Sequence, residues 1–191
     1  MRWVTASGVR HFSLHIAPNL GKRATPVSWV RTFGRKVTIM IIGIPRELLP
    51  GENRVAATPT TVPALLKLGY EVVVEAGAGE HAAQPDRAYE EAGARIVEPG
   101  EAWKADLVLA VNEPTDDQIS LMRAGAVLVT FLHPRQDLAL TEKLAAAGVT
   151  GLSMDMVPRI SRAQSMDALS SMANISGYRA VVEAALAFGR T

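Results

Sequence analysis

The residues best suited to chemistry lie in one short stretch, Pro158-Arg-Ile-Ser-Arg-Ala-Gln-Ser-Met-Asp-Ala-Leu-Ser-Ser171. It places two arginines, a glutamine, an aspartate and four serines just before a long helical pattern. Burying so many polar groups without partners is costly, and a solvated loop has no need of this particular set. Guanidinium, carboxylate, amide and hydroxyl groups together suit a polar ligand with ribose hydroxyls, phosphates or a carboxamide. The stretch is therefore the first candidate for binding a ligand.

A glycine-rich turn follows an apolar strand pattern at Gly77-Ala-Gly-Glu-His-Ala82. It fits a relaxed form of the fingerprint by which glycines let a backbone approach a pyrophosphate. Pro85, however, comes before any helical turn that could receive a phosphate. The acid expected about 20 residues further on would have to be Glu98, in Glu98-Pro-Gly. We interpret the segment as an ordinary glycine turn.

Two further segments leave predicted strands at their carboxyl ends, where open α/β sheets bind ligands. One runs from Gly43-Ile-Pro-Arg-Glu47 through Glu52-Asn-Arg-Val-Ala-Ala-Thr-Pro59. Its Arg54 has two equally weighted interpretations, a ligand-binding group or a salt-bridged residue of a surface loop. The other, Thr130-Phe-Leu-His-Pro134, places His133 where it could exchange a proton near neutral pH. A lone histidine at a strand end is more often structural.

The composition argues against several kinds of site. The chain has no cysteine, which excludes a disulfide scaffold and a thiolate metal site. Of the histidines at positions 11, 15, 81 and 133, only the first two have helical spacing, and no acidic residue accompanies them. We therefore predict no metal site. No serine lies in a nucleophile context, and the sequence contains no Walker-type phosphate loop.

Charge is distributed unevenly along the chain. Residues 1–39 contain seven Lys and Arg and no Asp or Glu. Residues 40–191 contain thirteen basic and nineteen acidic residues, a net charge of −6, which argues against nucleic-acid binding. The basic leader could be a targeting peptide or a membrane-surface arm, but its poor periodicity favours disorder or a start-site artefact ahead of Met40. No apolar run approaches the roughly 18–20 residues of a membrane span.

From Met40 onward, short apolar segments alternate with helical patterns. We expect strands at 39–44, 71–75, 95–97, 106–111, 126–132 and 149–152. Helices are expected at 60–68, 86–92, from 116, at 137–147 and at 167–188, with Asp86 capping the second. This alternation with short connections predicts a layered α/β domain with a mostly parallel sheet. The last helix would be about 33 Å long.

Three segments together resemble one family. The two segments from Gly43 to Pro59 and the stretch from Pro158 to Arg179 are similar to the amino-terminal domain shared by alanine dehydrogenases and proton-translocating NAD(P) transhydrogenases. The third segment is specific to the transhydrogenase alpha subunit. The resemblance covers about residues 40–190 and implies a Rossmann-like or flavodoxin-like fold. In the family a second domain carries the NAD glycine fingerprint, and the resemblance leads us to expect that this chain is a fragment without that domain.

The resemblance implies that this chain has three parts and that it is a fragment, inactive by itself, of a longer protein. These are a basic leader (1–39), the α/β domain (40–166) and a long helix (167–191) leading to the absent NAD-binding domain. The full protein would transfer hydride between NADH and NADP⁺ and couple this to proton translocation. NAD(H) would be the cofactor, with NADP(H) supplied by a beta subunit. The other implied partners are a membrane domain and a second alpha subunit, on the cytoplasmic face of the cell membrane.

The resemblance also implies roles for residues in the stretch from Pro158. Arg159 and Ser170 match residues that contact the nicotinamide carboxamide, Asp167 matches a ribose partner, and Gln164 matches the residue that reaches toward NADP(H). The same cofactor-binding set includes Ile160, Ser161 and Arg162. Hydride transfer between two dinucleotides needs no general acid or base, so we assign no catalytic residue.

Two alternatives remain open. Arg54 and His133 match the keto-acid site of an alanine dehydrogenase, and we treat them as candidate relics of a substrate site. That enzyme also needs a lysine before Glu-Pro, where Leu109-Ala-Val-Asn-Glu-Pro114 has none. The third interpretation is a non-catalytic docking or dimerisation domain.

Overall fold

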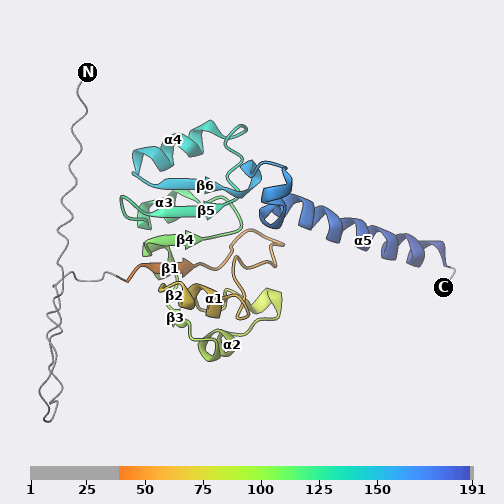
Figure 1. Cartoon of the computed structure of the whole chain (residues 1–191), viewed down its shortest axis with the longest axis horizontal. Helices are drawn as coiled ribbons and strands as arrows, with labels where there is room; N and C mark the ends of the chain where they lie inside the picture. Colours follow the sequence, from red (N-terminus) through yellow and green to blue (C-terminus); the bar gives the residue numbers. More distant parts are fainter. Residues whose placement is uncertain (1–38, 190–191) are drawn as a thin grey trace, which may run out of the picture. The chain divides into compact units, whose positions relative to one another are not determined.

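The computed structural model describes residues 39–189, so the expectations for the basic leader lie outside the described residues. Within this range a parallel sheet forms the centre (Figure 1). Its strands are β1 (Ile41–Ile44), β2 (Glu71–Glu75), β3 (Arg95–Val97), β4 (Leu107–Leu109), β5 (Val127–Thr130) and β6 (Thr150–Ser153). Their spatial order is β3-β2-β1-β4-β5-β6. The predicted parallel, layered α/β fold of the Rossmann-like kind is confirmed.

Helices occupy most of the connections. The α-helices are α1 (Val62–Lys67), α2 (Asp86–Glu91), α3 (Asp116–Leu121), α4 (Leu138–Ala146) and α5 (Ala168–Phe188). The shorter 3₁₀ helices are η1 (Glu80–Ala82), η2 (Glu101–Lys104), η3 (Met154–Met156) and η4 (Ser161–Met166). The candidate ligand-binding stretch thus contains η4 and the start of α5. Sequence patterns predicted no helix where η4 lies, because one or two tight turns leave no helical periodicity to detect.

Alternate residues of neighbouring strands pack into separate hydrophobic clusters. Ile42 of β1 packs with Val62 of α1 in one cluster, and Val108 of β4 packs with Ile119 of α3 in the other. Because successive side chains point to opposite faces of a sheet, α1 and α3 cover opposite faces. The chain therefore changes face between β1 and β4, and open parallel sheets form their binding crevice at such a switch point.

The glycine turn after β2 is closed by a carboxylate of its own chain. Gly77 has a φ of 75°, and its N–H donates to the two Asp86 carboxylate oxygens at 2.9 and 3.1 Å. The expectation that Asp86 caps α2 is wrong, because Pro85 precedes the helix and the Asp86 side chain is engaged by Gly77. The helix directly after Gly77 is the three-residue η1, and α2 begins only at Asp86. This agrees with the interpretation of the segment as a structural turn.

Tyr89 is the largest fully buried side chain, and its hydroxyl donates to the carbonyl oxygen of Ala57 at 2.9 Å. Burial, with the nearby Asp86 carboxylate, raises the pKa of Tyr89 to about 12, so the donor stays protonated. Replacing Tyr89 with Phe leaves a buried carbonyl without its partner. We expect a loss of about 1.5 kcal/mol in the free energy of unfolding, measured by denaturant titration. The exposed Tyr178→Phe variant is the control and should change it by less than about 0.5 kcal/mol.

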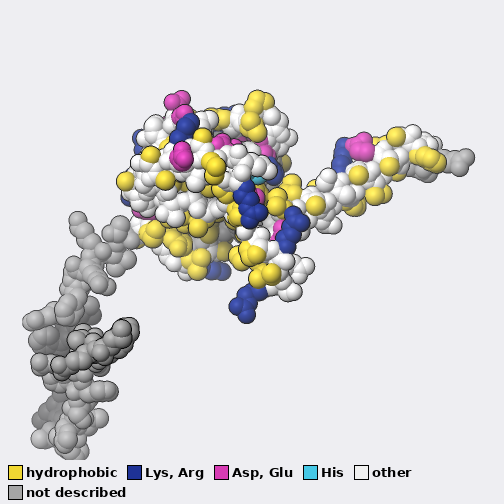
Figure 2. All heavy atoms as spheres, turned by 90° about the horizontal axis from the view of Figure 1, so that it is seen from above, with side chains coloured by type: hydrophobic (Ala, Val, Ile, Leu, Met, Phe, Trp, Pro, Cys, Tyr) yellow, Lys and Arg dark blue, Asp and Glu magenta, His cyan; other side chains and the backbone are white. Residues whose placement is uncertain are grey.

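None of the α5 residues is buried, although the helix is rich in apolar side chains. Figure 2 shows hydrophobic side chains along its length. The most exposed are Tyr178 at 76%, Phe188 at 75% and Val181 at 70%. In residues 39–189, no helix combines the length and the apolar character needed to cross a membrane.

Candidate functional site

The chain segments that follow β1, β4 and β5 meet at the carboxyl edge of the sheet. They contribute Glu47, Glu52 and Arg54 after β1, Asn112 and Glu113 after β4, and Phe131 and His133 after β5. The stretch that runs from η3 to the start of α5 lies at the same edge, since residues of α5 line the same cavities. The sequence predicted that the segments after β1 and β5 leave their strands at the carboxyl ends, and the sheet order places them beside the switch point between β1 and β4.

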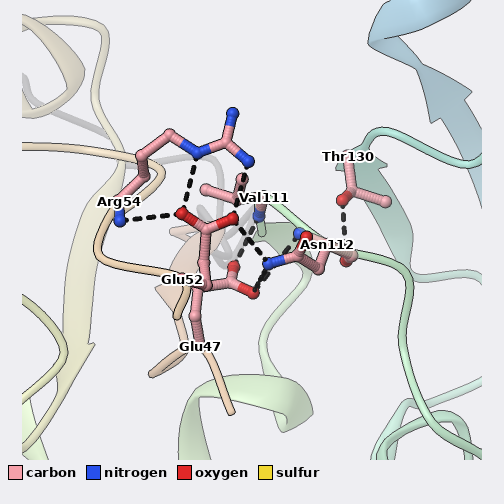
Figure 3. Close-up of polar contacts among 6 residues, drawn as sticks. All are labelled: Glu47, Glu52, Arg54, Val111, Asn112 and Thr130. Atoms are coloured by element: carbon pink, nitrogen blue, oxygen red, sulfur yellow. Dashed lines mark hydrogen bonds and ion pairs between the residues drawn. The ribbon is translucent and has the colours of Figure 1, made fainter. Parts of the chain in front are cut away.

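A chain of hydrogen bonds joins the β1 and β4 segments, and we call it the carboxylate network (Figure 3). Glu47 accepts the Val111 N–H at 2.6 Å and the Asn112 side-chain N–H at 2.9 Å. The same Asn112 nitrogen donates to Glu52 at 3.1 Å. Glu52 in turn accepts from Arg54 Nε at 2.8 Å and Nη2 at 2.6 Å. One neutral amide therefore bridges two carboxylates, and one of these holds the arginine.

The electrostatics of the network favour the charged forms of Glu52 and Arg54. The Arg54 side chain lowers the pKa of Glu52 to about 2, against the opposing effect of burial, and the backbone N–H of Arg54 and the Asn112 amide contribute further. Glu52 likewise raises the pKa of Arg54. The Glu52 side chain is 8% exposed and Arg54 is 43% exposed, so the carboxylate is enclosed while the guanidinium reaches the surface of the crevice. The interpretation of Arg54 as a salt-bridged residue is correct, and this does not exclude a binding role.

Two adjoining cavities open beside the network. The first has a volume of about 390 Å³ and is lined by Arg54, Asn112, Glu113 and His133, with apolar walls from Phe131 and Met172 among others. The second has a volume of about 530 Å³ and extends under η4 and the start of α5, lined by Met154, Met166 and Ser171 among others. Arg54, Val111, Phe131 and Met172 line both cavities, so the two adjoin, and we call them together the crevice.

His133 has a left-handed backbone, with a φ of 44°, which is uncommon for residues other than glycine. Its N–H and that of Leu132 donate to the Asp155 carboxylate at 3.3 and 3.1 Å, which holds this turn in place. Burial acts to raise the pKa of Asp155, but the hydrogen bonds from Ser153, His133 and Leu132 lower it overall. The imidazole Nδ1 lies 3.0 Å from a Glu113 carboxylate oxygen. The side chain is therefore held at the wall of the first cavity.

The seven residues predicted to bind the cofactor do not line these cavities. Five of them are exposed on the segment of η4, namely Arg159, Ile160, Ser161, Arg162 and Gln164. Asp167 and Ser170 bind each other at the start of α5, where Asp167 accepts the Ser170 N–H at 3.0 Å and its hydroxyl at 2.5 Å. Ser165, Met166, Ala168 and Ser171 face the second cavity instead. The predicted set thus lies outside the cavities, and we call its exposed part at residues 159–164 the outward face of η4, whereas Arg54 and His133 line the first cavity.

Sequence reasoning missed four residues of this site: Glu52 as the partner of Arg54, Glu47 as the other carboxylate of the network, Asn112 as the bridge between them, and Asp155 as the support of His133. Glu52 lies two residues before Arg54, so that pair had a local signal. Glu47 and Asn112 are 65 residues apart, and only the pairing of β1 with β4 brings them together. Within residues 39–189, no group of three or more His, Cys, Asp or Glu side chains is placed to hold a metal ion.

Acid should weaken the fold through Glu52. Its pKa is lowered from 4.5 to about 2, so its contribution is present above about pH 4.5 and is lost as the pH falls toward 2. Replacing Glu52 with Gln should lower the free energy of unfolding by about 1–2 kcal/mol at pH 7. The loss is no larger because solvent at the partly exposed Arg54 weakens the ion pair. The difference from the unchanged protein should shrink near pH 2. Denaturant titrations at both pH values measure this, with the exposed Glu142→Gln as control; an equal cost at both would contradict it.

Comparisons with known proteins agree on one family. The model described as alanine dehydrogenase/PNT, N-terminal domain, matches residues 43–176. The NAD(P) transhydrogenase subunit alpha of Haemophilus influenzae is 57% identical over 150 residues, which cover 78% of this chain and 29% of the relative. The alanine dehydrogenase of Bacillus subtilis is 38% identical over 142 residues, 74% of this chain and 37% of that enzyme. The structure of a transhydrogenase from Sinorhizobium meliloti has a TM-score of 0.74 at 45% identity, over 76% of this chain and 44% of that one. This chain therefore spans less than a third of the length of the Haemophilus relative.

Proposed function

Because this chain belongs to the alanine dehydrogenase/PNT N-terminal domain family, we propose that it forms the amino-terminal part of an NAD(P) transhydrogenase alpha subunit. In this role it helps to position NAD(H) for hydride transfer to NADP⁺. The observation that carries the choice within the family is the charge of the crevice. Among the residues that line the two cavities, Arg54 is the one guanidinium or ammonium group, and Glu52 already holds it. A 2-oxo acid would find no second guanidinium or ammonium group there.

The exposed face of η4 supports a cofactor role for the predicted set. Arg159, Arg162 and Gln164 present donors to the outside, which suits a ligand held partly by another domain or subunit. Within residues 39–189, no carboxylate lies within 4 Å of either arginine. In this proposal NAD(H) lies against this face, a beta subunit supplies NADP(H), and membrane partners couple the reaction to proton movement.

An alanine-dehydrogenase-like activity is the second candidate. The observation in its favour is that Arg54 and His133 line the same cavity, as two groups of a small-acid site would. The His133 ring is paired with Glu113 rather than open to the cavity alone, and the adjacent position 112 is an amide. These contacts make the site a poor receptor for a carboxylate.

A chimera can test the proposed function. Residues 40–189 of this chain would replace the matching 150 residues of the Haemophilus alpha subunit, produced together with its beta subunit. We expect NADH-dependent reduction of an NADP⁺ analogue at a rate within about tenfold of the unchanged complex. We expect no pyruvate- and ammonia-dependent oxidation of NADH. The reverse pattern would favour the dehydrogenase, and a folded complex with neither activity would favour a docking role.

A further inference from the structure

The segment from Val157 to Gly189, which contains η4 and α5, is attached to the sheet without hydrogen bonds. Its backbone N–H groups donate within the segment or, at Val157 itself, to the carbonyl oxygen of Met154 at 3.4 Å. Of its charged side chains, Arg179 pairs with Glu183 one turn away. In residues 39–189, no hydrogen bond or ion pair joins this segment to the strands or to the loops after β1, β4 and β5.

Apolar contacts therefore hold η4 and the start of α5 in place. Ala163 of η4 is buried, and Met166 and Met172 line the second cavity together with Leu109 and Phe131 from the edge of the sheet. The stabilisation that such contacts give depends on the apolar surface that they remove from water. A polar group placed on this wall would weaken them, and no polar contact from the segment to the sheet would compensate.

Methionine is concentrated around the second cavity. Of the seven methionines in the chain, four lie in the short stretch from η3 to the first turns of α5, namely Met154, Met156, Met166 and Met172. Met166 is 55% exposed and Met172 is 38% exposed, so a small oxidant reaches both thioethers from solvent. Met122, by contrast, is buried in the hydrophobic cluster around α3. The thioethers that hold η4 are thus accessible, and the one in the core is not.

We propose that Met166 and Met172 form a redox-sensitive switch, in which their oxidation by a peroxide releases η4 from the crevice. With hydrogen peroxide, the thioether sulfur attacks one peroxide oxygen, the O–O bond breaks, an S–O bond forms, and the other oxygen leaves as water with both protons. The sulfur loses two electrons and the peroxide gains them. The product, methionine sulfoxide, is polar where the thioether was apolar, and methionine-rich contacts are disrupted by this change.

The effect of the switch on hydride transfer rests on the proposed function. Release of η4 would displace Arg159 and Gln164 on its outward face, which the proposed function assigns to the dinucleotides. Oxidation would therefore lower turnover while the sheet stays folded. Methionine sulfoxide reductases convert the sulfoxides back to thioethers, so the switch is reversible.

Amide hydrogen exchange of the isotopically labelled 191-residue chain tests the switch. The chain would be treated with hydrogen peroxide until mass spectrometry shows that Met166 and Met172 are oxidised. Exchange would then be followed at Ala163 and Asp167, whose N–H groups donate within η4. We expect exchange about tenfold faster at both after oxidation and no change at Val73 in β2. Methionine sulfoxide reductases should restore the original rates.

Two results of this measurement would overturn the proposal. One is unchanged or slower exchange at Ala163 in the oxidised chain, which would mean that the sulfoxide oxygens find donors, such as the Ser165 and Ser171 hydroxyls at the same cavity. The other is an equal acceleration at Val73, which would mean that oxidation unfolds the whole domain and not η4 alone.

Leucine variants show whether these thioethers are responsible. Leucine is apolar and similar in volume, so Met166→Leu/Met172→Leu should fold and exchange within about twofold of the unchanged chain before treatment. It should not respond to peroxide. Met40→Leu, at a 43% exposed position before β1, is the matched control and should keep the tenfold response. A tenfold response in the double variant would also overturn the proposal. Exchange does not involve hydride transfer, so failure here leaves the proposed function to be tested by the chimera.

Discussion

Replacing Gly43 with alanine is expected to prevent stable folding. Gly43 lies in the middle of β1, and a Cβ built there would lie 1.9 Å from the carbonyl oxygen and 2.8 Å from the carbonyl carbon of Ala102. These are backbone atoms of η2, whose Ala102 is fully buried, so no flexible side chain can move aside. The strand and η2 would have to separate. We expect a loss of more than about 4 kcal/mol in the free energy of unfolding.

The matched control for Gly43→Ala is Gly177→Ala. Gly177 lies inside α5, where an added Cβ would meet nothing within 4 Å. Alanine has the higher helix propensity, so this variant should gain about 0.5–1 kcal/mol. Thermal and denaturant unfolding of both variants measure the contrast. A loss below about 1 kcal/mol for Gly43→Ala would mean that η2 does not pack against β1 as described.

Replacing Arg159 with alanine in the chimeric alpha subunit is expected to reduce kcat/KM for NADH about 100-fold. That factor corresponds to about 2.7 kcal/mol, the size of a charge-assisted contact or two. Stability should be unaffected, because Arg159 is exposed and has no carboxylate within 4 Å in the described residues. Gln164→Ala should reduce hydride transfer to the NADP⁺ analogue more than it weakens NADH binding, since its predicted role lies toward the second nucleotide.

The control for these two variants is Arg87→Ala, on the exposed surface of α2. Arg87 pairs only with Glu91 one turn away, and its side chain is 86% exposed. We expect turnover within about twofold of the unchanged chimera. Wild-type rates in both the Arg159 and the Gln164 variants would show that the outward face of η4 does not hold the dinucleotides. The cofactor would then have to be placed in the crevice beside Arg54.

Local patterns predicted the elements well because their causes are local. The valines of β2 and the apolar run of β1 indicate buried strands, and each was observed within two residues of its predicted bounds. The helix from position 167 was observed as Ala168–Phe188, with Asp167 accepting the Ser170 N–H as its cap. The prediction that Asp86 caps α2 was wrong because the partner of Asp86 is not local. Its carboxylate binds Gly77 across the turn, and nine residues of separation leave no pattern in the sequence.

The two interpretations of Arg54 illustrate where prediction from sequence stops. Its position at the end of β1 was predictable, because strand order in an α/β pattern places such loops at one edge. Its charge environment was not, because Asn112 reaches Glu52 from 60 residues away. The assignment of seven residues around η4 to cofactor binding also remains a prediction from the sequence. The residue types in the stretch from Pro158 indicate a polar ligand, and the structure adds which of them face outward.

Hydrophobic periodicity and glycine positions were enough to specify a parallel α/β domain and a long final helix, since these depend on neighbours a few residues apart. The tertiary structure alone decided the character of the crevice. The pairing of β1 with β4 brings two glutamates, an asparagine and an arginine into one hydrogen-bonded network. Arg159 and Gln164 are exposed and line neither cavity beside it. The first candidate stretch thus separates into exposed residues outside the crevice and residues that line it. That division depends on packing between segments far apart in the chain, and no local pattern encodes it.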